Sequence, residues 1–393
     1  APIIAFLYDF DKTLCTTDME DYAFIPSLGY TPAEFWGRAN AFGWQNRMDG
    51  LLAYMYTMIE ECRAQGKRLD RELLVRCGHN IELFPGVREW FDRIDAFGDS
   101  LGVTVEHYVL SSGLREIIEG SGIADKFKMI YACEFFYDRN GLASWPKLDV
   151  NFTNKTQFVY RINKGVLDVA DDRQLNGSMP DDSKRVPFSN MLYIGDGLSD
   201  VPCMKMMQAY GGQAIAVYQS SNRSGVEELL RRGRVDFIFP ADYREGMGLD
   251  VTVKNIIRKM AICDALTAEN AAQMRRLACR RDDDAEALRR RILRKRWRRM
   301  FAVAGLLFLL LLLPSLYSTR CVGASVAANT LHDGPVCAIL ILVYYEKTSN
   351  TGRKTPFGEN QKGRNQILCC KTLNCIIWTT PRRPSLRRTW RMS

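Results

Sequence analysis

Apolar residues follow one another in several short stretches of this chain, and the stretches recur at intervals typical of a sheet. Residues 3–8 (IIAFLY) are all aliphatic or aromatic, which is typical of a strand buried on both faces. Apolar-rich runs at residues 103–111, 191–194, 214–218 and 236–239 predict further strands. Because helical patterns separate these runs, we expect an α/β fold with a parallel, doubly wound sheet.

A block of helical pattern interrupts this alternation after the first strand. Thr31 and Glu34 form a predicted capping box, from which a helix can run toward Ala41. Further helices are expected over residues 51–65 and 71–78, each ending at a glycine. We therefore expect an all-helical cap at residues 18–83, inserted into a core formed by residues 1–17 and 84–260.

The second half of the body returns to strands and helices. Asn140-Gly141 is a strong turn signal and predicts a hairpin between two short strands. Lys155 opens an amphipathic helix, and residues 165–186 are polar and rich in turn residues, which indicates a surface excursion. A long helix after Leu249 is expected to end the body near Arg280.

Two carboxylates, Asp9 and Asp11, follow the first strand with one residue between them. The carboxyl ends of parallel strands line the crevice in which open α/β sheets bind ligands. Side chains alternate along an extended segment, so Asp9 and Asp11 can face one ligand while Phe10 points into the core. Two like charges so close favour a bound cation, and Mg²⁺ is the natural one. A solvated acidic turn is the alternative.

Other polar side chains stand at comparable positions later in the chain. Ser111 ends the second strand run, Lys155 opens a helix, and Asp196 and Asp200 follow the run at 191–194. Together with Asp9 and Asp11, these residues supply a nucleophile, a hydroxyl, a cation and metal-binding carboxylates. Such a set fits phosphoryl transfer, in which catalysis is mostly positioning and neutralisation of charge.

Three of these assignments have alternatives within the sequence. Asp196 and Asp200 could cap the helix that follows them, because acidic groups favour helix amino termini. Ser112 could take the place of Ser111. Lys164, which stands before a glycine at a helix end, could take the place of Lys155.

The strings YDFDKTL, VLSSG, NKTQ and YIGDGLSD occur in this order. They resemble the four motifs of the haloacid dehalogenase-like (HAD) superfamily, in the branch whose cap lies between the first two motifs and which includes phosphoserine-phosphatase-like members. The resemblance covers residues 1 to about 260 and implies a Rossmann-like core. It further implies that Asp9 is the nucleophile of an aspartyl-phosphate intermediate and that Asp11 protonates the leaving group and then activates water.

The resemblance also implies the metal and phosphate ligands. Mg²⁺ would be held by Asp9, Asp196 and the backbone carbonyl of Asp11, with Asp200 in or just behind that shell. The phosphoryl oxygens would be held by the serine turn and the motif lysine, which here are Ser111, Ser112, Gly113 and Lys155.

The residue at position 11 separates the activities of the superfamily. Its dehalogenases lack the second aspartate and its transport ATPases carry threonine there, so Asp11 indicates a phosphatase for a small phosphorylated metabolite. A phosphotransferase is an alternative, as is a non-catalytic scaffold or membrane-tethered binding protein built on the fold. For substrate choice, Asp18 and Glu20 could bind an amine and Arg38 and Arg47 a second anion, or all four could face solvent.

The distribution of charged residues distinguishes the carboxyl-terminal part of the chain from the rest. Residues 281–393 carry 21 Lys and Arg against 7 Asp and Glu, whereas residues 1–280 carry 33 against 38. The net charge of +9 therefore belongs to an appendage, and the body gives no support to nucleic-acid binding. A nucleic-acid-binding tail has charge alone in its favour.

The appendage combines a basic helical extension at residues 261–300 with an almost wholly apolar run at 301–317. The run has the minimum length for a transmembrane helix, so residues 289–317 are a candidate membrane anchor. The cations on its amino side would keep the body in the cytoplasm, and no signal peptide is visible at the amino end. Residues 318–393 have no sustained period and are expected to be irregular or disordered; a frame error in the gene is the alternative to a real anchor.

The 12 cysteines are scattered and contain no CxxC pair. This spacing is typical of reduced thiols in a cytosolic protein rather than of disulfides or a zinc site. Cys369, Cys370 and Cys375 form a weak alternative as a metal cluster, since a fourth ligand of suitable spacing is missing. The sequence indicates neither a particular substrate nor an oligomeric state.

Overall fold

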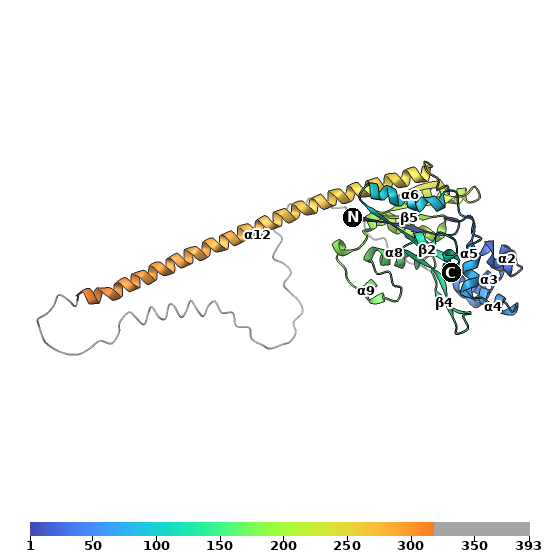
Figure 1. Ribbon diagram of the computed structural model, residues 1–393, viewed down its shortest axis with the longest axis horizontal. Helices are drawn as coiled ribbons and strands as arrows, with labels where there is room; N and C mark the ends of the chain where they lie inside the picture. The colour runs from blue at the N-terminus through green and yellow to red at the C-terminus, as the bar shows by residue number, and fades with distance from the viewer. Residues whose placement is uncertain (318–393) are drawn as a thin grey trace, which may run out of the picture. The chain divides into compact units, whose positions relative to one another are not determined.

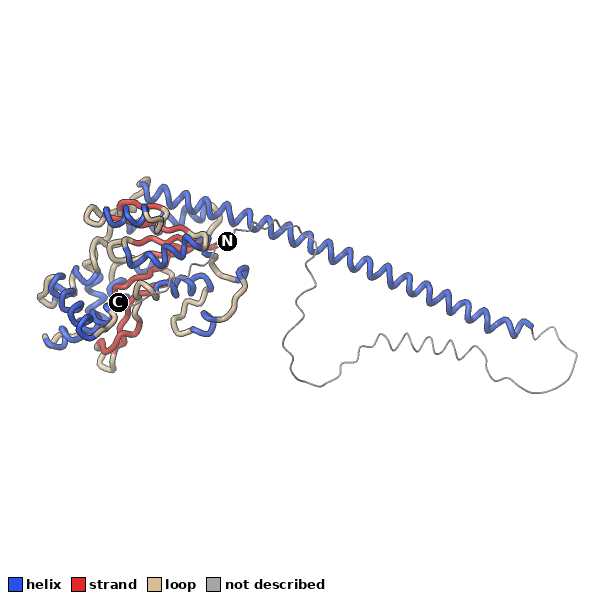
Figure 2. The backbone as a smooth tube through the Cα atoms, turned by 180° about the vertical axis from the view of Figure 1, so that it is seen from behind, coloured by secondary structure: helices blue, strands red, loops and turns tan. Residues whose placement is uncertain are grey.

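Seven strands form one sheet in the order β4-β3-β2-β1-β5-β6-β7. The computed structural model describes residues 1–317, with the side chains of residues 1–181 and 183–311. All neighbouring strands are parallel except β3 and β4, which form the predicted hairpin. The predicted α/β fold with a parallel sheet is thus confirmed (Figures 1 and 2). The strands are β1 (Ile3–Tyr8), β2 (Thr104–Leu114), β3 (Met129–Tyr137), β4 (Ala143–Leu148), β5 (Met191–Gly195), β6 (Gln213–Tyr218) and β7 (Phe237–Pro240).

The direction in which strands are added reverses beside β1. The chain places β2 and β3 on one side of β1, then returns to place β5, β6 and β7 on the other side. Tyr8, the last residue of β1, is therefore in register with both Val109 of β2 and Ile194 of β5. In open α/β sheets such a reversal opens a crevice at the carboxyl ends of the strands.

Helices cover the sheet on both faces, as a doubly wound fold requires. Figure 1 shows α6 and the beginning of α12 on one side and α8 on the other. Arg93 of α6 pairs with Asp250 of α12 at 3.1 Å, which holds these two helices together. The helices after residue 83 are α6 (Val87–Ser100), α7 (Arg115–Glu119), α8 (Lys155–Lys164), α9 (Asp172–Asn176), α10 (Val201–Ala209), α11 (Arg223–Arg231) and α12 (Gly248–Tyr317), with 3₁₀ turns at Ala124–Lys126, Asp181–Ser183, Phe188–Asn190 and Leu198–Asp200.

Six helices lie between β1 and β2 in the sequence, and the first five of them gather at one end of the sheet (Figure 1). The predicted capping box is present, since Thr31 accepts from the backbone of Glu34 and the Glu34 carboxylate accepts from the backbone of Thr31. This helix extends beyond the expected Ala41 because Phe42 stacks on Tyr56 of the next helix, with ring centroids 4.8 Å apart. The five helices are α1 (Met19–Tyr22), α2 (Phe24–Ser27), α3 (Pro32–Asn46), α4 (Gly50–Ala64) and α5 (Arg71–Gly78).

The last helix runs through the extension that the sequence predicted to be helical. We expected the body to end near Arg280 and residues 261–300 to be helical, and α12 continues without a break from Gly248 to Tyr317. Its first turns bury Leu249, Val253 and Ile257, whereas the residues from 265 to 280 are largely exposed. The sequence there is rich in alanine, leucine and arginine, which are strong helix formers, so no terminating signal acts at Arg280.

The chain divides into two units, Ala1–Arg294 and Lys295–Ser393. In the described part of the chain no helix is long and apolar enough to cross a membrane. The candidate anchor at residues 289–317 is therefore not supported; its apolar run has 17 residues, whereas a bilayer needs about 20. The predictions for residues 318–393, including the alternative cluster of Cys369, Cys370 and Cys375, lie outside the described residues.

The cysteines of the described residues are free thiols, as their spacing predicted. Five of them, at positions 15, 62, 77, 133 and 203, are buried and act as small apolar side chains.

Two glycines allow the inserted helix α5 to approach α7 of the core. A Cβ on Gly78 would lie 2.1 Å from the carbonyl oxygen of Ile117, and one on Gly120 would lie 1.9 Å from that of Val75. Both contacts are with backbone, which cannot move aside as a flexible side chain can. We expect Gly78→Ala to lower the free energy of unfolding by about 2 to 3 kcal/mol, because overpacking would force the two helices apart.

Chemical denaturation of the full chain would measure this effect. Gly37→Ala is the matched control, since a Cβ there meets nothing within 4 Å on an exposed helix face. That substitution should stabilise by roughly 0.5 kcal/mol through helix propensity. Equal stabilities of the two variants would contradict the close crossing.

Candidate active site

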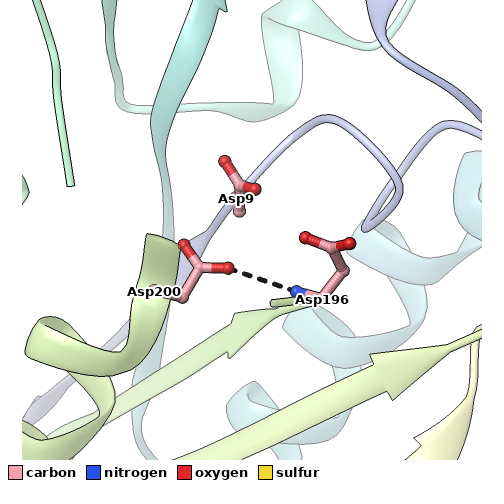
Figure 3. A group of neighbouring side chains, drawn as sticks. All are labelled: Asp9, Asp196 and Asp200. Atoms are coloured by element: carbon pink, nitrogen blue, oxygen red, sulfur yellow. Dashed lines mark hydrogen bonds between the residues drawn. The ribbon is translucent and has the colours of Figure 1, made fainter. Parts of the chain in front are cut away.

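Asp9 and Asp196 meet because the strands that carry them are neighbours. Asp9 directly follows β1, and its backbone N–H donates to the carbonyl of Ile194 in β5 at 2.9 Å. Asp196 directly follows β5. Asp9, Asp196 and Asp200 each offer one carboxylate oxygen, and these three oxygens lie within 4.8 Å of one another (Figure 3). Residues almost 190 positions apart thus share one end of the sheet.

Lys155 is the buried cation of this group. It is the first residue of α8 and is fully buried. Its Nζ lies 3.0 Å from Oδ1 of Asp9 and 2.8 Å from Oδ1 of Asp200. Burial alone would lower the pKa of this ammonium, but the charges of Asp200 and Asp9 outweigh it and raise the pKa above its ordinary value. Lys155 therefore keeps its proton at neutral pH.

Lys164, the alternative, lies at the other end of the same helix. Its ammonium donates to the carbonyls of Leu175 and Gly177 at 2.6 and 2.8 Å and holds the surface excursion after α8. The structure brings Lys155, and not Lys164, to the carboxylates.

Asp200 has no free oxygen. Its Oδ1 accepts from the Tyr193 hydroxyl at 2.7 Å and from Lys155, while its Oδ2 accepts from the backbone N–H groups of Asp196 and Gly197 at 3.2 and 3.4 Å. It makes no side-chain capping bond to α10. Asp200 thus positions Lys155 and the Asp196 backbone, and it leaves Asp9 and Asp196 as the carboxylates with room for a metal ion.

The charge of the group fits a divalent cation. Burial and the neighbouring Asp200 raise the pKa of Asp9 to about 7, and burial together with Asp9 raises the pKa of Asp196 to about 8. Three carboxylates against one buried ammonium leave negative charge to be neutralised. Oxygen donors of this kind suit Mg²⁺, which is commonly bound through one or two carboxylates. Asp9 and Asp196 would hold it.

The carboxylate of Asp11 does not join this group. Its Oδ1 accepts from the backbone N–H of Met19 at 2.9 Å, and the Cys15 thiol lies 3.7 Å from the same oxygen. Burial, followed by the charge of Glu20, raises the pKa of Asp11 well above its ordinary value. A carboxyl group with a raised pKa keeps its proton to a higher pH than usual, which suits a general acid.

The two serines near the carboxyl end of β2 are used differently. Ser111 is buried, and its Oγ accepts from the backbone N–H of Gly113 at 3.0 Å, so its own hydrogen remains for another acceptor. Ser112 donates its hydroxyl to the carbonyl of Val150 at 2.8 Å. Gly113 lies against Asp11, since a Cβ on it would be 2.8 Å from Oδ2 of that residue. Ser111 is thus the serine with a hydrogen to offer.

A cavity of about 260 Å³ opens beside Asp11. Its lining includes the other two acidic candidates, Asp18 and Glu20. Arg38 and Arg47 do not line it: Arg38 pairs with Glu61 at 3.2 Å, and Arg47 ends α3 in a left-handed conformation with φ of 51°. The expectation that the arginines bind a second anion at this site has no support in the geometry.

Sequence reasoning missed two residues of the site. Lys12 adopts a left-handed conformation with φ of 55°, which is unusual for a residue with a side chain. Its ammonium binds both carboxylate oxygens of Asp18, at 2.8 and 2.7 Å. Tyr193 holds Asp200 from within β5. The charge of Lys12 inside the first motif was a signal for it, but nothing distinguishes Tyr193 from its apolar neighbours in the sequence.

Comparison with protein families gives one match. The model of the family described as haloacid dehalogenase-like hydrolase matches residues 6–205, about half of the chain. An uncharacterized protein of Borreliella burgdorferi is 27% identical over 276 residues, which are 63% of this chain and 94% of that protein.

Two solved structures illustrate the structural likenesses. A HAD family hydrolase of Salmonella enterica serovar Typhi is 15% identical with a TM-score of 0.43, over 64% of this chain and 70% of that chain. A phosphoserine phosphatase in its apo form is 16% identical with a TM-score of 0.42, over 62% of this chain and 96% of that chain. Likenesses at this level say nothing of the substrate of this chain.

Proposed function

Because the chain belongs to the haloacid dehalogenase-like hydrolases, we propose that it is a Mg²⁺-dependent phosphatase that hydrolyses a small phosphomonoester through an aspartyl-phosphate. The observation that carries this proposal is the convergence of Asp9, Asp196 and Asp200 on one buried lysine at the carboxyl ends of β1 and β5. A carboxylate nucleophile and an anionic phosphoryl group repel each other, so positive charge is needed to bring them together. This site supplies a buried lysine and carboxylates that can bind a metal ion.

In the first half of the reaction Asp9 attacks phosphorus. A bond forms between a carboxylate oxygen of Asp9 and phosphorus as the ester P–O bond breaks, and Asp11 gives its proton to the departing alkoxide. Lys155 holds Asp9 in place from Oδ1, which leaves the other oxygen for attack. Ser111 would donate its hydrogen to a phosphoryl oxygen. Bound Mg²⁺ would neutralise charge on the phosphoryl oxygens and orient them.

In the second half the aspartyl-phosphate is hydrolysed. Asp11, now ionised, takes a proton from water as the water oxygen bonds to phosphorus, and the bond between Asp9 and phosphorus breaks. Inorganic phosphate leaves, Asp9 is again a carboxylate and Asp11 again carries its proton. The buried setting of Asp11 favours the return of that proton.

Turnover of p-nitrophenyl phosphate by the full chain tests the proposal. We expect Mg²⁺-dependent release of p-nitrophenol, with a loss of at least about 100-fold when EDTA removes the metal, because charge neutralisation by the ion is worth several kcal/mol. Added Mg²⁺ in excess of EDTA should restore the rate. An inactive chain, or a rate that EDTA leaves unchanged, would favour the alternative of a non-catalytic scaffold.

A further inference from the structure

Helix α12 carries large apolar side chains that stay exposed after it leaves the body of the protein. Asp264 accepts a hydrogen bond from Asn190 at 2.6 Å, and residues 265–294 after it are almost entirely exposed. Six large apolar side chains between residues 262 and 292 are each more than half exposed. We call these six the apolar stripe: Ile262, Leu266, Met274, Leu277, Leu288 and Ile292.

The apolar stripe is confined to one face of the helix. At 3.6 residues per turn, its six members lie within an arc of about 120°. Leu266, Leu277 and Leu288 recur every 11 residues, which is about three turns, so they stand almost in line along the helix. Leu293, which is 53% exposed, lies on nearly the opposite side. A face of this kind is typical of a helix that packs against a partner.

The body of the protein is not that partner. Val253 and Ile257 pack α12 against the body and are fully buried. They are turned by about a third of a turn from Leu266 and Leu277. The apolar stripe therefore does not continue the face that packs on the body, and an exposed apolar patch among charged side chains marks an interaction surface.

The apolar stripe is symmetric about Leu277. Leu266 and Leu288 each lie 11 residues from it. Ile262 and Ile292 each lie 15 residues from it. If two copies of α12 run antiparallel with a two-fold axis at Leu277, each leucine faces the other leucine of the second copy, and the isoleucines do the same. A two-fold interface requires such self-complementarity, because the same surface meets itself.

The polar side chains on the same face fit this arrangement. Asn270 and Asp284 each lie 7 residues from Leu277, and Gln273 and Arg281 each lie 4 residues from it. In the antiparallel pair Asn270 therefore faces Asp284, and its amide can donate to the carboxylate. Gln273 faces Arg281, and its amide oxygen can accept from the guanidinium.

Two further arginines lie on this face. Arg280 would face Met274 of the second copy, and Arg291 would face Cys263. An arginine can lay its methylene groups along such side chains while its guanidinium stays in water.

The opposite direction of pairing is disfavoured by charge. A parallel pair in register places each residue against its own copy, so Arg281 would face Arg281 and Asp284 would face Asp284. Like charges at the contact of two helices are destabilising. The charges on this face therefore favour the antiparallel direction.

We propose that the apolar stripe is covered by a second copy of this chain, with two α12 helices antiparallel across a two-fold axis at Leu277. The paired segments of residues 262–292 are about 46 Å long. This inference goes beyond the proposed function and does not depend on it, because the stripe is remote in sequence from every residue of the candidate active site.

Sedimentation equilibrium of the full chain tests the proposal. We expect a reversible dimer with a dissociation constant of about 1 to 10 µM, in the range of transient complexes, because polar pairs interrupt the apolar contacts. A chain that is monomeric at 100-fold higher concentration overturns the proposal.

Leu277→Glu places two carboxylates against each other at the axis and removes the central apolar contact. We expect it to raise the dissociation constant by at least about 100-fold. Leu293→Glu is the matched control, because it makes the same change on the same helix at a side chain of nearly equal exposure, 53% against 54%. It should leave the dissociation constant within about threefold. A dimer that both variants leave intact overturns the proposal, because the contact then lies elsewhere.

Two substitutions at Asn270 test the direction of pairing. Asn270→Lys faces Asp284 in the antiparallel pair and should tighten the dimer by about three- to tenfold, since each dimer gains two charge pairs. Asn270→Asp should weaken it by a similar factor. In a parallel pair both substitutions place like charges against each other, so weakening by both overturns the antiparallel arrangement.

Other occupants of the stripe give different results. A monomer that loses stability in Leu277→Glu but not in Leu293→Glu means that another segment of the same chain covers the stripe, which overturns the proposal. A monomer that binds vesicles of anionic phospholipid, and loses that binding in Leu277→Glu alone, overturns it in favour of a lipid surface.

Discussion

Asp9→Asn is expected to reduce turnover of p-nitrophenyl phosphate by at least about 10⁴-fold, because an amide can neither attack phosphorus nor leave from it. The loss should appear in kcat, since it removes a bond that is made only during the reaction. Steady-state kinetics on the full chain with saturating Mg²⁺ would measure it.

The stability of this variant separates a chemical loss from an unfolded protein. Burial and Asp200 raise the pKa of Asp9 to about 7, so the ionised carboxylate is unfavourable in the folded state and its replacement by a neutral amide should not lower the melting temperature. Asp70→Asn is the matched control: Asp70 caps α5 by accepting from Leu73, and asparagine caps helices equally well. Turnover within tenfold of the unaltered chain in Asp9→Asn would exclude Asp9 as the nucleophile.

The same variant offers a second measurement. After acid quench during turnover, the peptide that contains Asp9 should carry one phosphoryl group in the unaltered chain and none in Asp9→Asn. A phosphoryl group on another residue would mean that a different nucleophile acts in this site.

Lys155→Met is expected to cost both activity and stability. Turnover should fall by about 10² to 10³-fold, because the buried ammonium that holds Asp9 is lost. The free energy of unfolding should fall by about 3 kcal/mol, the usual cost of removing one partner from a buried ion pair. Chemical denaturation and steady-state kinetics would measure the two effects on one preparation.

Lys164→Met is the matched control, because it also removes a lysine from α8 but not the one that binds Asp9. The ammonium of Lys164 donates to two carbonyls of the surface excursion and approaches no carboxylate of the site. Its replacement should cost about 1 kcal/mol of stability and leave turnover unchanged. If the Lys164 variant loses more activity than the Lys155 variant, the assignment of the motif lysine is wrong.

Most of the fold could be predicted because the signals for it are local. The run of residues 3–8 is apolar throughout, and the structure has β1 at Ile3–Tyr8. The capping signal at Thr31 and the Asn-Gly turn of the hairpin specify backbone geometry within a few residues, and both features are present. The helical extension at residues 261–300 is likewise present as part of α12, since the sequence near Arg280 contains no residue that stops a helix.

The candidate site could be predicted only in outline. That Asp9 and Asp196 share one end of the sheet follows from the rule that parallel strands carry their chemistry at their carboxyl ends. The same rule does not say which lysine approaches them, because Lys155 and Lys164 begin and end the same helix. The division into core and cap, and the catalytic roles of the residues, stay predictions that the experiments above address.

The sequence by itself determined the order of strands and helices, the positions of the acidic motifs and the family, since each of these depends on neighbouring residues. Only the tertiary structure decided that Lys155 binds Asp9 and Asp200, that Asp18 is neutralised by Lys12, and that Oε1 of Glu20 is buried without a hydrogen-bond partner among the described residues. Lys155 is 146 positions from Asp9. Contacts over such distances depend on how the sheet, its covering helices and the inserted helices pack, and the energy of a buried charge depends on every group that surrounds it.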